Sequence, residues 1–377
     1  MKNNFKIHRV VLKILLWIVV ICFVGFLIFV GLQISGKNRL YKKSANKTPD
    51  LHVAEIDWGE ESSESGNEES GEATTSQPIL VTQEDTDNWE EGDVRFKGVH
   101  YRYNSEMLTF LFMGIDQDGT VKKAKSGIDG GQSDAIFLLA LNPKTHEVSI
   151  INVNRNTMAD VDVYDKAGNY STTSHIQITL QHAYGDGKEL SCERSVNAIS
   201  KLFYNLPIHG YCAINLGAVP KINDAVGGVD VVALEDVTSG SKLIFKEGVK
   251  YHLKGQMATT YIQARDDSFE ASRRRGDRQK QYVVAYADAA KNAIKNDVTL
   301  FVKLYNTISK YMVTDVTVDE VSYFSTQIAD YNFDGTHMYS LEGETIVNPN
   351  TEIEEFYADD KAMFELILKV FYDVIED

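Results

Sequence analysis

An apolar run near the N-terminus constrains the chain more than any other feature. Residues 14–32 contain no charged side chain and are dense in Ile, Leu, Val and Phe. About 20 apolar residues span a bilayer as a helix, whereas the apolar core of a cleaved signal peptide has about 7–15 residues. The run therefore predicts an uncleaved transmembrane anchor over residues 14–34, after a cytoplasmic tail of residues 1–13.

The orientation of this anchor is predicted from chain length rather than from charge. Lys and Arg flank the run on both sides, so the excess of positive charge does not decide which side is cytoplasmic. A long C-terminal part is translocated largely regardless of its charge. We therefore expect a single-pass protein of the cell membrane with the bulk of the chain extracytoplasmic.

The segment after the anchor has the composition of a disordered linker. The chain carries a net charge of −16, and residues 48–94 contain no Lys or Arg. Acidic, Ser, Gly and Thr residues with few apolar ones cannot offset the entropy of ordering, which predicts an acidic linker over residues 35–95. The acidity also argues against nucleic acid as a partner, because phosphate binding requires a basic surface.

The cysteines give little evidence for a disulfide. Cys22 lies in the predicted span, so only Cys192 and Cys212 are available to pair with each other. Two buried thiols are the simpler expectation, because Cys212 lies in an apolar run typical of a strand.

Apolar patterns from residue 107 onward predict the fold class. Short runs that indicate strands covered on both faces lie at residues 107–113, 135–141, 148–153 and 229–234. Apolar residues at helical spacing occur at residues 190–203, 218–226, 255–264 and 279–294. Interleaved strands and helices indicate a layered α/β or α+β domain with a central mixed sheet flanked by helices, which we expect over residues 96–285.

The remaining residues, 286–377, are predicted to form a helical extension packed on that domain. Candidate helices cover residues 298–312, 318–331 and 354–375. Acidic residues lie near the start of the second and third, as the helix dipole favours.

Two carboxylates follow or precede predicted strands. Asp116 comes directly after the first strand, and Asp134 begins the next. Ligands of open α/β sheets bind beyond the carboxyl ends of strands, and Mg²⁺ prefers a few carboxylates together with phosphate oxygens. The pair is therefore a candidate Mg²⁺ site, although Asp134 taken alone is better explained as the end of a loop.

Arginines supply the matching anion contacts. Arg155 directly follows a buried strand, where its guanidinium suits bidentate contact with phosphate or carboxylate. A second group, unusually dense for so acidic a chain, comprises Arg265, Arg273, Arg274, Arg275 and Arg278. A solvent-exposed charge run is the ordinary alternative for this group.

The order of these motifs resembles the LytR-CpsA-Psr family of cell-envelope glycopolymer transferases. The matching pieces are Gly-Ile-Asp ending at Asp116, Ser-Asp-Ala-Ile around Asp134, Asn-Arg-Asn-Thr around Arg155, Gly-Gly-Val-Asp ending at Asp230, and Arg-Gly-Asp-Arg-Gln at residues 275–279. They extend over residues 107–285.

The resemblance implies a function and assigns roles. The family's domain binds a polyprenyl pyrophosphate-linked glycan and, assisted by Mg²⁺, transfers the glycan with one phosphate to a peptidoglycan acceptor. Asp116 and Asp134 match its acidic pair near metal and pyrophosphate, and either is a candidate to accept the acceptor's proton. The positions matching phosphate or substrate contacts are Arg155, Arg265, Arg275, Arg278 and Gln279. Walls for the lipid, or alternatively plain core, are Ile136, Leu138, Leu202, Phe203, Ile214 and Val219.

Three positions depart from the family's pattern. Gln132 and Gln263 stand where arginines are common, and Asn156 stands where Asp is frequent. Each glutamine removes a cation and its fork of donors from the pyrophosphate site. The leading prediction is a membrane-anchored phosphotransferase, and the alternatives are a non-catalytic binder of the lipid-linked glycan or a lipid pyrophosphatase that regulates envelope assembly.

Overall fold

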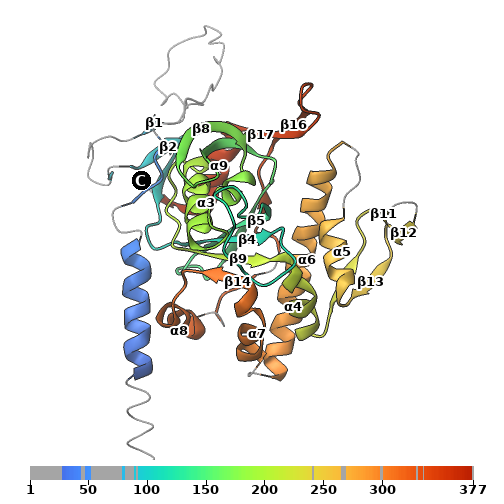
Figure 1. Ribbon diagram of the computed structural model, residues 1–377. Coiled ribbons are helices and arrows are strands. Elements are labelled where there is room, and N and C mark those ends of the chain that lie inside the picture. Colours follow the sequence, from blue (N-terminus) through green and yellow to red (C-terminus); the bar gives the residue numbers. More distant parts are fainter. Residues whose placement is uncertain are drawn as a thin grey trace, which may run out of the picture.

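The computed structural model in Figure 1 gives the fold of the chain. It describes residues 28–43, 47–51, 79–80, 89–90, 92–239, 242–264, 269–297, 300–327, 330–333 and 335–375. Most of the predicted anchor, residues 14–27, and most of the predicted linker lie outside this part.

A six-stranded mixed sheet forms the centre, in the order β14-β9-β4-β5-β6-β15. Its long strands β4 (Leu108–Ile115), β5 (Ser133–Leu141) and β6 (Val148–Val153) confirm the first three predicted strands. β4 is antiparallel to β5, β5 is antiparallel to β6, and β9 (Gly210–Asn215) is parallel to β4. The carboxyl ends of β4 and β6 therefore lie at the same edge as the amino end of β5.

Alternation along β4 explains why both faces of the sheet are covered. Leu111 and Met113 belong to the main core with helices α3 (Glu189–Leu202) and α9 (Asp360–Phe371). Leu108 and Phe110 belong to a second core, with Tyr323 of α8 (Val318–Gln327). Successive side chains of a strand point to opposite faces of the sheet, and helices cover both faces (Figure 1). This is the predicted layered α+β domain with a central mixed sheet.

Smaller sheets and hairpins surround this centre. The four-stranded sheet joins β1 (Ile79–Leu80), β2 (Val94–Phe96), β3 (Val99–Tyr103) and β18 (Tyr372–Ile375). Two hairpins pair β7 (Met158–Tyr164) with β8 (Tyr170–Gln177), and β16 (Gly343–Val347) with β17 (Glu354–Ala358). The short α2 (Leu180–Ala183) precedes α3. Cys192 and Cys212 are both free thiols, and Cys192 is buried as expected whereas Cys212 is half-buried.

A separate cluster of helices and short strands has its own apolar core. Its strands are β10 (Val229–Val232), β11 (Val237–Ser239), β12 (Lys242–Phe245) and β13 (Lys250–Leu253). Its helices are α4 (Val219–Ala225), preceded by the 3₁₀ turn Leu216–Ala218, α5 (Gln256–Gln263) and α6 (Ala271–Asn296). β10 was predicted to be covered on both faces, which is wrong: it pairs only with β13 and exposes alternate residues.

The C-terminal part corrects the predicted helical extension. Helices α7 (Leu300–Ile308), α8 and α9 lie within the three predicted ranges, and the 3₁₀ turn Ser309–Tyr311 follows α7. However, β14 (Met312–Thr314) pairs with β9 and β15 (Met338–Ser340) pairs with β6, so both belong to the central sheet. These strands of three residues are too short for an apolar pattern to reveal them. Residues 286–377 are thus an integral part of the domain.

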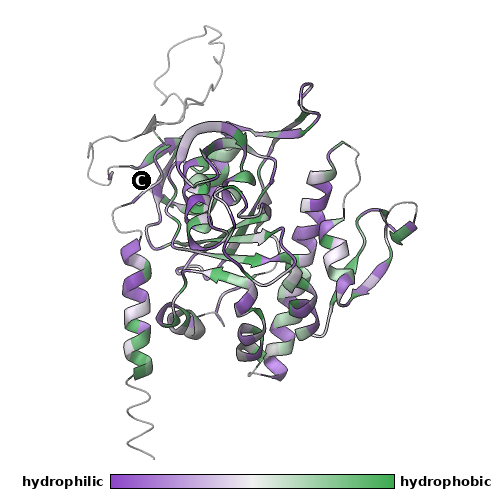
Figure 2. Cartoon of the chain, in the orientation of Figure 1, coloured by the Kyte–Doolittle hydropathy of each residue, from purple (hydrophilic) through white to green (hydrophobic). Residues whose placement is uncertain are grey.

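The N-terminal boundary also differs from the prediction. Residues 28–43 form a helix that continues beyond the predicted end of the anchor, and Figure 2 shows it apolar at its first turns and polar toward the domain. Leu40 is completely buried in the second core, and Lys43 forms ion pairs with Asp315 and Glu320 at 3.3 and 3.1 Å. Residues 35–43 are therefore docked rather than part of the predicted linker. Among the described residues, no helix is both long and apolar enough to cross a membrane.

This docking predicts a stability effect. Leu40→Ala leaves a cavity between the N-terminal helix, β4 and α8, and we expect it to lower the free energy of unfolding by about 2 to 5 kcal/mol. Thermal unfolding of the detergent-solubilised chain measures the change, with Asn38→Ala on the exposed side of the same helix as control. Equal unfolding temperatures for the two variants would contradict the docking.

Candidate active site

The predicted site residues meet at one edge of the central sheet. Asp116 follows β4, Asp134 lies at the start of β5, and Arg155 follows β6. The pairing of Ile115 with Ser133, and of Ile136 with Val153, brings these ends together. The three residues therefore converge at one edge, as expected from their places at strand ends.

The centre of the site is a carboxylate held between two guanidinium groups. Asp134 Oδ1 lies 2.8 Å from Arg155 Nη1, and Asp134 Oδ2 lies 3.4 Å from Arg275 Nη1. The side chains of Asp134 and Arg275 are only 10% and 4% exposed. Gln132 Oε1 accepts a further hydrogen bond from Arg155 Nη2. Two cations and one anion leave a net positive charge, which suits the binding of phosphate oxygens.

Helix α6 brings Arg275 to the sheet edge through close packing. A Cβ at Gly276 would lie 3.0 Å from Asn152 Nδ2 near the end of β6, so a larger residue there would require the Asn152 side chain to shift. Asn156 supports the same contact, because its Nδ2 donates to Ser272 Oγ of α6 over 2.9 Å. The asparagine in place of the family's aspartate thus fastens the loop after β6 to α6.

An open cavity of about 870 Å³ lies over this cluster. Its walls include six of the predicted residues, namely Asp116, Gln132, Asp134, Arg155, Gln263 and Arg275. Asp116 and Gln132 are also linked through their backbones, because the Asp116 N–H donates to the Gln132 carbonyl over 2.9 Å. The structure therefore brings the acidic pair, two arginines and both substituted glutamines to one cavity.

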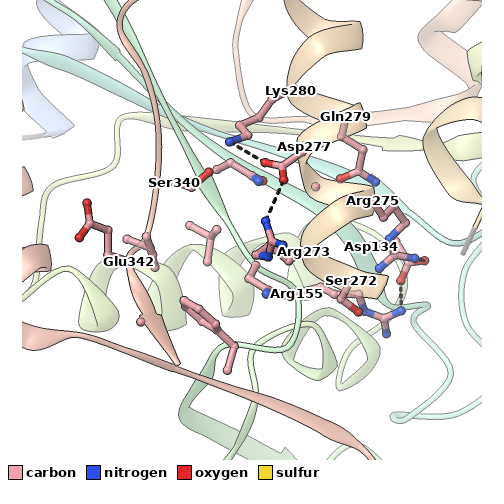
Figure 3. A pocket seen from close by; sticks show the side chains of 17 residues that line it. Asp134, Arg155, Ser272, Arg273, Arg275, Asp277, Gln279, Lys280, Ser340 and Glu342 are labelled. Carbon is pink, nitrogen blue, oxygen red and sulfur yellow. Dashed lines mark hydrogen bonds and ion pairs between the residues drawn. The ribbon is translucent and has the colours of Figure 1, made fainter. Parts of the chain in front are cut away.

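A second cavity of about 430 Å³ adjoins the cluster, and Figure 3 shows its lining side chains beside α6. Asp134, Arg155, Ser272 and Arg275 line both cavities. Side-chain pairs on α6 form part of its wall, since Asp277 contacts Arg273 at 3.4 Å and Lys280 at 2.9 Å.

Three predicted substrate contacts do not join the large cavity. Arg278 is buried against Glu235, with 3.1 Å between its Nε and the carboxylate, and it donates to the Ala264 carbonyl. Gln279 Nε2 donates to the Ile262 carbonyl over 3.2 Å and lines only the smaller cavity. Both side chains tie α6 to the segment around α5, and their assignment as substrate contacts stays a prediction. Arg265 lies outside the described residues.

The predicted lipid walls are mostly core. Ile136, Leu138 and Phe203 are buried in the main core, and Val219 is buried in the core of the smaller cluster. The alternative of plain packing therefore holds for these residues.

Sequence reasoning missed the contribution of the C-terminal hairpin. Glu352 and Glu354 line the large cavity, as does Gln177 at the end of β8. Gln177 Nε2 donates to the Glu354 carbonyl over 2.7 Å, which joins the two hairpins. No motif marks these residues, because their place depends on the pairing of segments about 180 residues apart.

The donor set for a metal is small. In the part of the chain that the structure describes, no three His, Cys, Asp or Glu residues are grouped to hold a metal ion. Asp116 is exposed, whereas both Asp134 oxygens face arginines. Two carboxylates fit Mg²⁺ only when substrate phosphates complete its ligands.

Solved structures agree with this architecture. TagV of Bacillus subtilis superposes with a TM-score of 0.54 at 21% identity, over 70% of this chain and 95% of that chain. A Streptococcus agalactiae protein gives a TM-score of 0.54 at 18% identity, over 71% of this chain and 87% of that chain. At these identities the likeness concerns the fold, and the central mixed sheet flanked by helices is confirmed.

Sequence relatives carry transferase names. The polyisoprenyl-teichoic acid–peptidoglycan teichoic acid transferase TagU of Bacillus cereus is 28% identical over 223 residues, 58% of this chain and 63% of TagU. TagV of Bacillus subtilis, which has the same descriptive transferase name, is 27% identical over 219 residues, 56% of this chain and 51% of TagV. The chain thus spans less than two thirds of each relative. The family model described as LytR_cpsA_psr family matches residues 72–368, most of the chain, which therefore belongs to the LytR-CpsA-Psr family.

Proposed function

We propose that this protein is a membrane-anchored, extracytoplasmic phosphotransferase. Its donor is a glycan on a polyprenyl diphosphate, and its acceptor is a sugar hydroxyl of peptidoglycan. The observation that carries the proposal is the nearly buried cluster of Asp134, Arg155 and Arg275 beside an 870 Å³ cavity. Family membership and the transferase names of the relatives support it.

The arginines supply what displacement at phosphorus requires. The acceptor oxygen forms a bond to the phosphorus next to the glycan, the bond to the bridging oxygen breaks, and polyprenyl phosphate leaves. Catalysis of such a step depends mainly on positioning and on electrostatic stabilisation of the phosphate oxygens. Arg155 and Arg275, both oriented by Asp134, provide fixed guanidinium forks for these oxygens.

The proton of the acceptor hydroxyl passes to Asp116 in this scheme. Both oxygens of Asp134 already face guanidinium groups, so this carboxylate serves to orient the arginines. Asp116 is exposed at the mouth of the same cavity and stands open to an incoming hydroxyl. A general base must reach the proton that it removes, and geometry comes before any other criterion.

Mg²⁺ is the proposed cofactor. Asp116 would bind the ion through one oxygen and leave the other to the acceptor hydroxyl, and Asp134 would add a lone pair that is not directed at an arginine. The diphosphate oxygens would complete the set, because Mg²⁺ usually combines one or two carboxylates with substrate phosphates. When bound, it neutralises negative charge that develops on the phosphate oxygens.

A specific observation keeps the non-catalytic binder as the second candidate. Gln132, which replaces an arginine of the family's pattern, engages Arg155 through its carbonyl oxygen. A neutral side chain that only forms a hydrogen bond thus stands in place of a cation, which lowers the positive charge that the site offers to a diphosphate. A site with fewer cations holds the donor but stabilises the transition state less.

A transfer assay decides between these functions. The full chain in detergent is incubated with a polyprenyl diphosphate glycan, peptidoglycan oligomers and Mg²⁺, and products are followed by mass spectrometry. We expect an acceptor that carries the glycan and one phosphate, and a rate about 100-fold lower in EDTA. Free glycan phosphate without acceptor product would indicate the pyrophosphatase, and donor binding without product would indicate the binder. An unchanged rate in EDTA would remove Mg²⁺ from the proposal.

A further inference from the structure

The large cavity has an acidic rim beside its arginines. Among its described lining residues, Arg155 and Arg275 are cationic, whereas Asp116, Asp134, Glu352 and Glu354 are anionic. Asp134 lies between the two arginines, so its charge is compensated. The other three carboxylates form no ion pair within the described part of the chain. They leave negative charge around the opening.

The β16–β17 hairpin holds two of these carboxylates in place. The Phe356 N–H donates to the Asn156 carbonyl over 2.9 Å, and Glu354 Oε2 lies 3.4 Å from Asn156 Nδ2. Gln177 binds the Glu354 backbone from the other side. Glu354 is therefore half-buried against the wall that also carries Arg155, while Glu352 is exposed at the rim.

Glu352 and Glu354 do not belong to the pair, Asp116 and Asp134, that would hold Mg²⁺ in the proposed function. Their charges act on the part of the donor that lies beside them. Glutamine amides complete the lining, from Gln117, Gln132, Gln177 and Gln263. An amide offers both donors and an acceptor, which matches sugar hydroxyls, whereas fixed carboxylates repel anionic groups.

We infer that the site selects a donor whose sugars next to the diphosphate carry no negative charge, and that Glu352 and Glu354 are its specificity-determining residues. The diphosphate contacts the arginines, and the first sugars lie against the amides and the acidic rim. A glycan with carboxylate or phosphate groups on these sugars meets like charges there. The inference rests on the proposed function, because it assigns the donor of that reaction.

Matched donors test the inference. Three polyprenyl diphosphates with the same lipid carry a neutral disaccharide, the same disaccharide with a uronic acid, or one with an added phosphate. The full chain in detergent is compared with Glu352→Gln, Glu354→Gln, the double variant, and Glu344→Gln as control. Glu344 is an exposed carboxylate of the same hairpin that lines neither cavity. Transfer gives kcat/KM, and calorimetry gives donor binding.

We expect wild type to prefer the neutral donor about tenfold or more over each anionic donor, and the double variant to lose most of this preference. Glu344→Gln should keep it. Equal use of the donors, a preference for an anionic one, or an unchanged preference in the double variant would overturn the inference. Absence of transfer from every donor would contradict the proposed function instead, and the binding preference would then decide the inference alone.

Discussion

Arg275→Ala is expected to lower kcat/KM for glycan transfer about 1,000-fold. Single guanidinium groups on a transferred phosphoryl group are worth about 10³ to 10⁵ in rate, and Arg275 is one of two that flank Asp134. Its loss also leaves Asp134 paired with Arg155 alone, which reduces the positive charge available to the donor. Arg155→Ala should have an effect of similar size. The transfer assay measures kcat/KM for both variants.

Because Arg275 is nearly buried, the loss of activity in Arg275→Ala must be distinguished from a loss of folding. Arg275→Lys keeps the charge but lacks the planar fork, so we expect an intermediate rate with an unfolding temperature close to that of wild type. The control Lys291→Ala removes an exposed cation of the same helix and should leave the rate unchanged. Full activity in Arg275→Lys and Arg275→Ala would show that this guanidinium does not contact the donor.

The sheet edge of the site was predictable, but the partners supplied by α6 were only partly so. Asp116, Asp134 and Arg155 each adjoin an apolar run, and the ends of neighbouring strands converge. The arginine run at residues 273–275 contained no apolar period, so the helix predicted at residues 279–294 was not extended to it and the helical phase of the arginines was not evident. That phase decides the outcome: Arg273 is 53% exposed and pairs with Glu270, whereas Arg275 is nearly buried against Asp134.

The C-terminal contribution was beyond sequence reasoning for a different reason. β14 and β15 have three residues each and join strands that lie about 100 and 190 residues earlier. Such pairing is determined by tertiary packing, and a three-residue strand carries no measurable alternation. The same holds for Glu352 and Glu354, whose place in the cavity depends on the docking of β17 against Asn156.

Asp93→Ala is expected to be the most destabilising of the substitutions considered. Asp93 is 1% exposed. Its carboxylate accepts two hydrogen bonds from Arg102 at 2.9 and 2.8 Å, and lies 2.7 Å from His100 Nε2. Removing one member of a buried ion pair costs about 3 to 5 kcal/mol. Arg102 keeps its pair with the exposed Glu90 at 2.7 Å, so we expect a cost near the lower end of this range. We expect the unfolding temperature to fall by about 10 °C. Glu365→Ala, which removes a surface pair with Lys97, should cost less than about 1 kcal/mol.

The same carboxylate predicts how stability depends on pH. Burial alone would raise the pKa of Asp93, but hydrogen bonds from Arg102, the Glu90 backbone and His100 outweigh it, so the pKa lies below its ordinary value. The contribution is therefore fully present above the ordinary pKa of about 4 and is lost as the pH falls through the lower folded value. In denaturant unfolding, the advantage of wild type over Asp93→Asn should be constant above about pH 5 and should shrink toward pH 3. A difference that grows on acidification would mean that the carboxylate is protonated in the folded protein and that the network with Arg102 is not ionic.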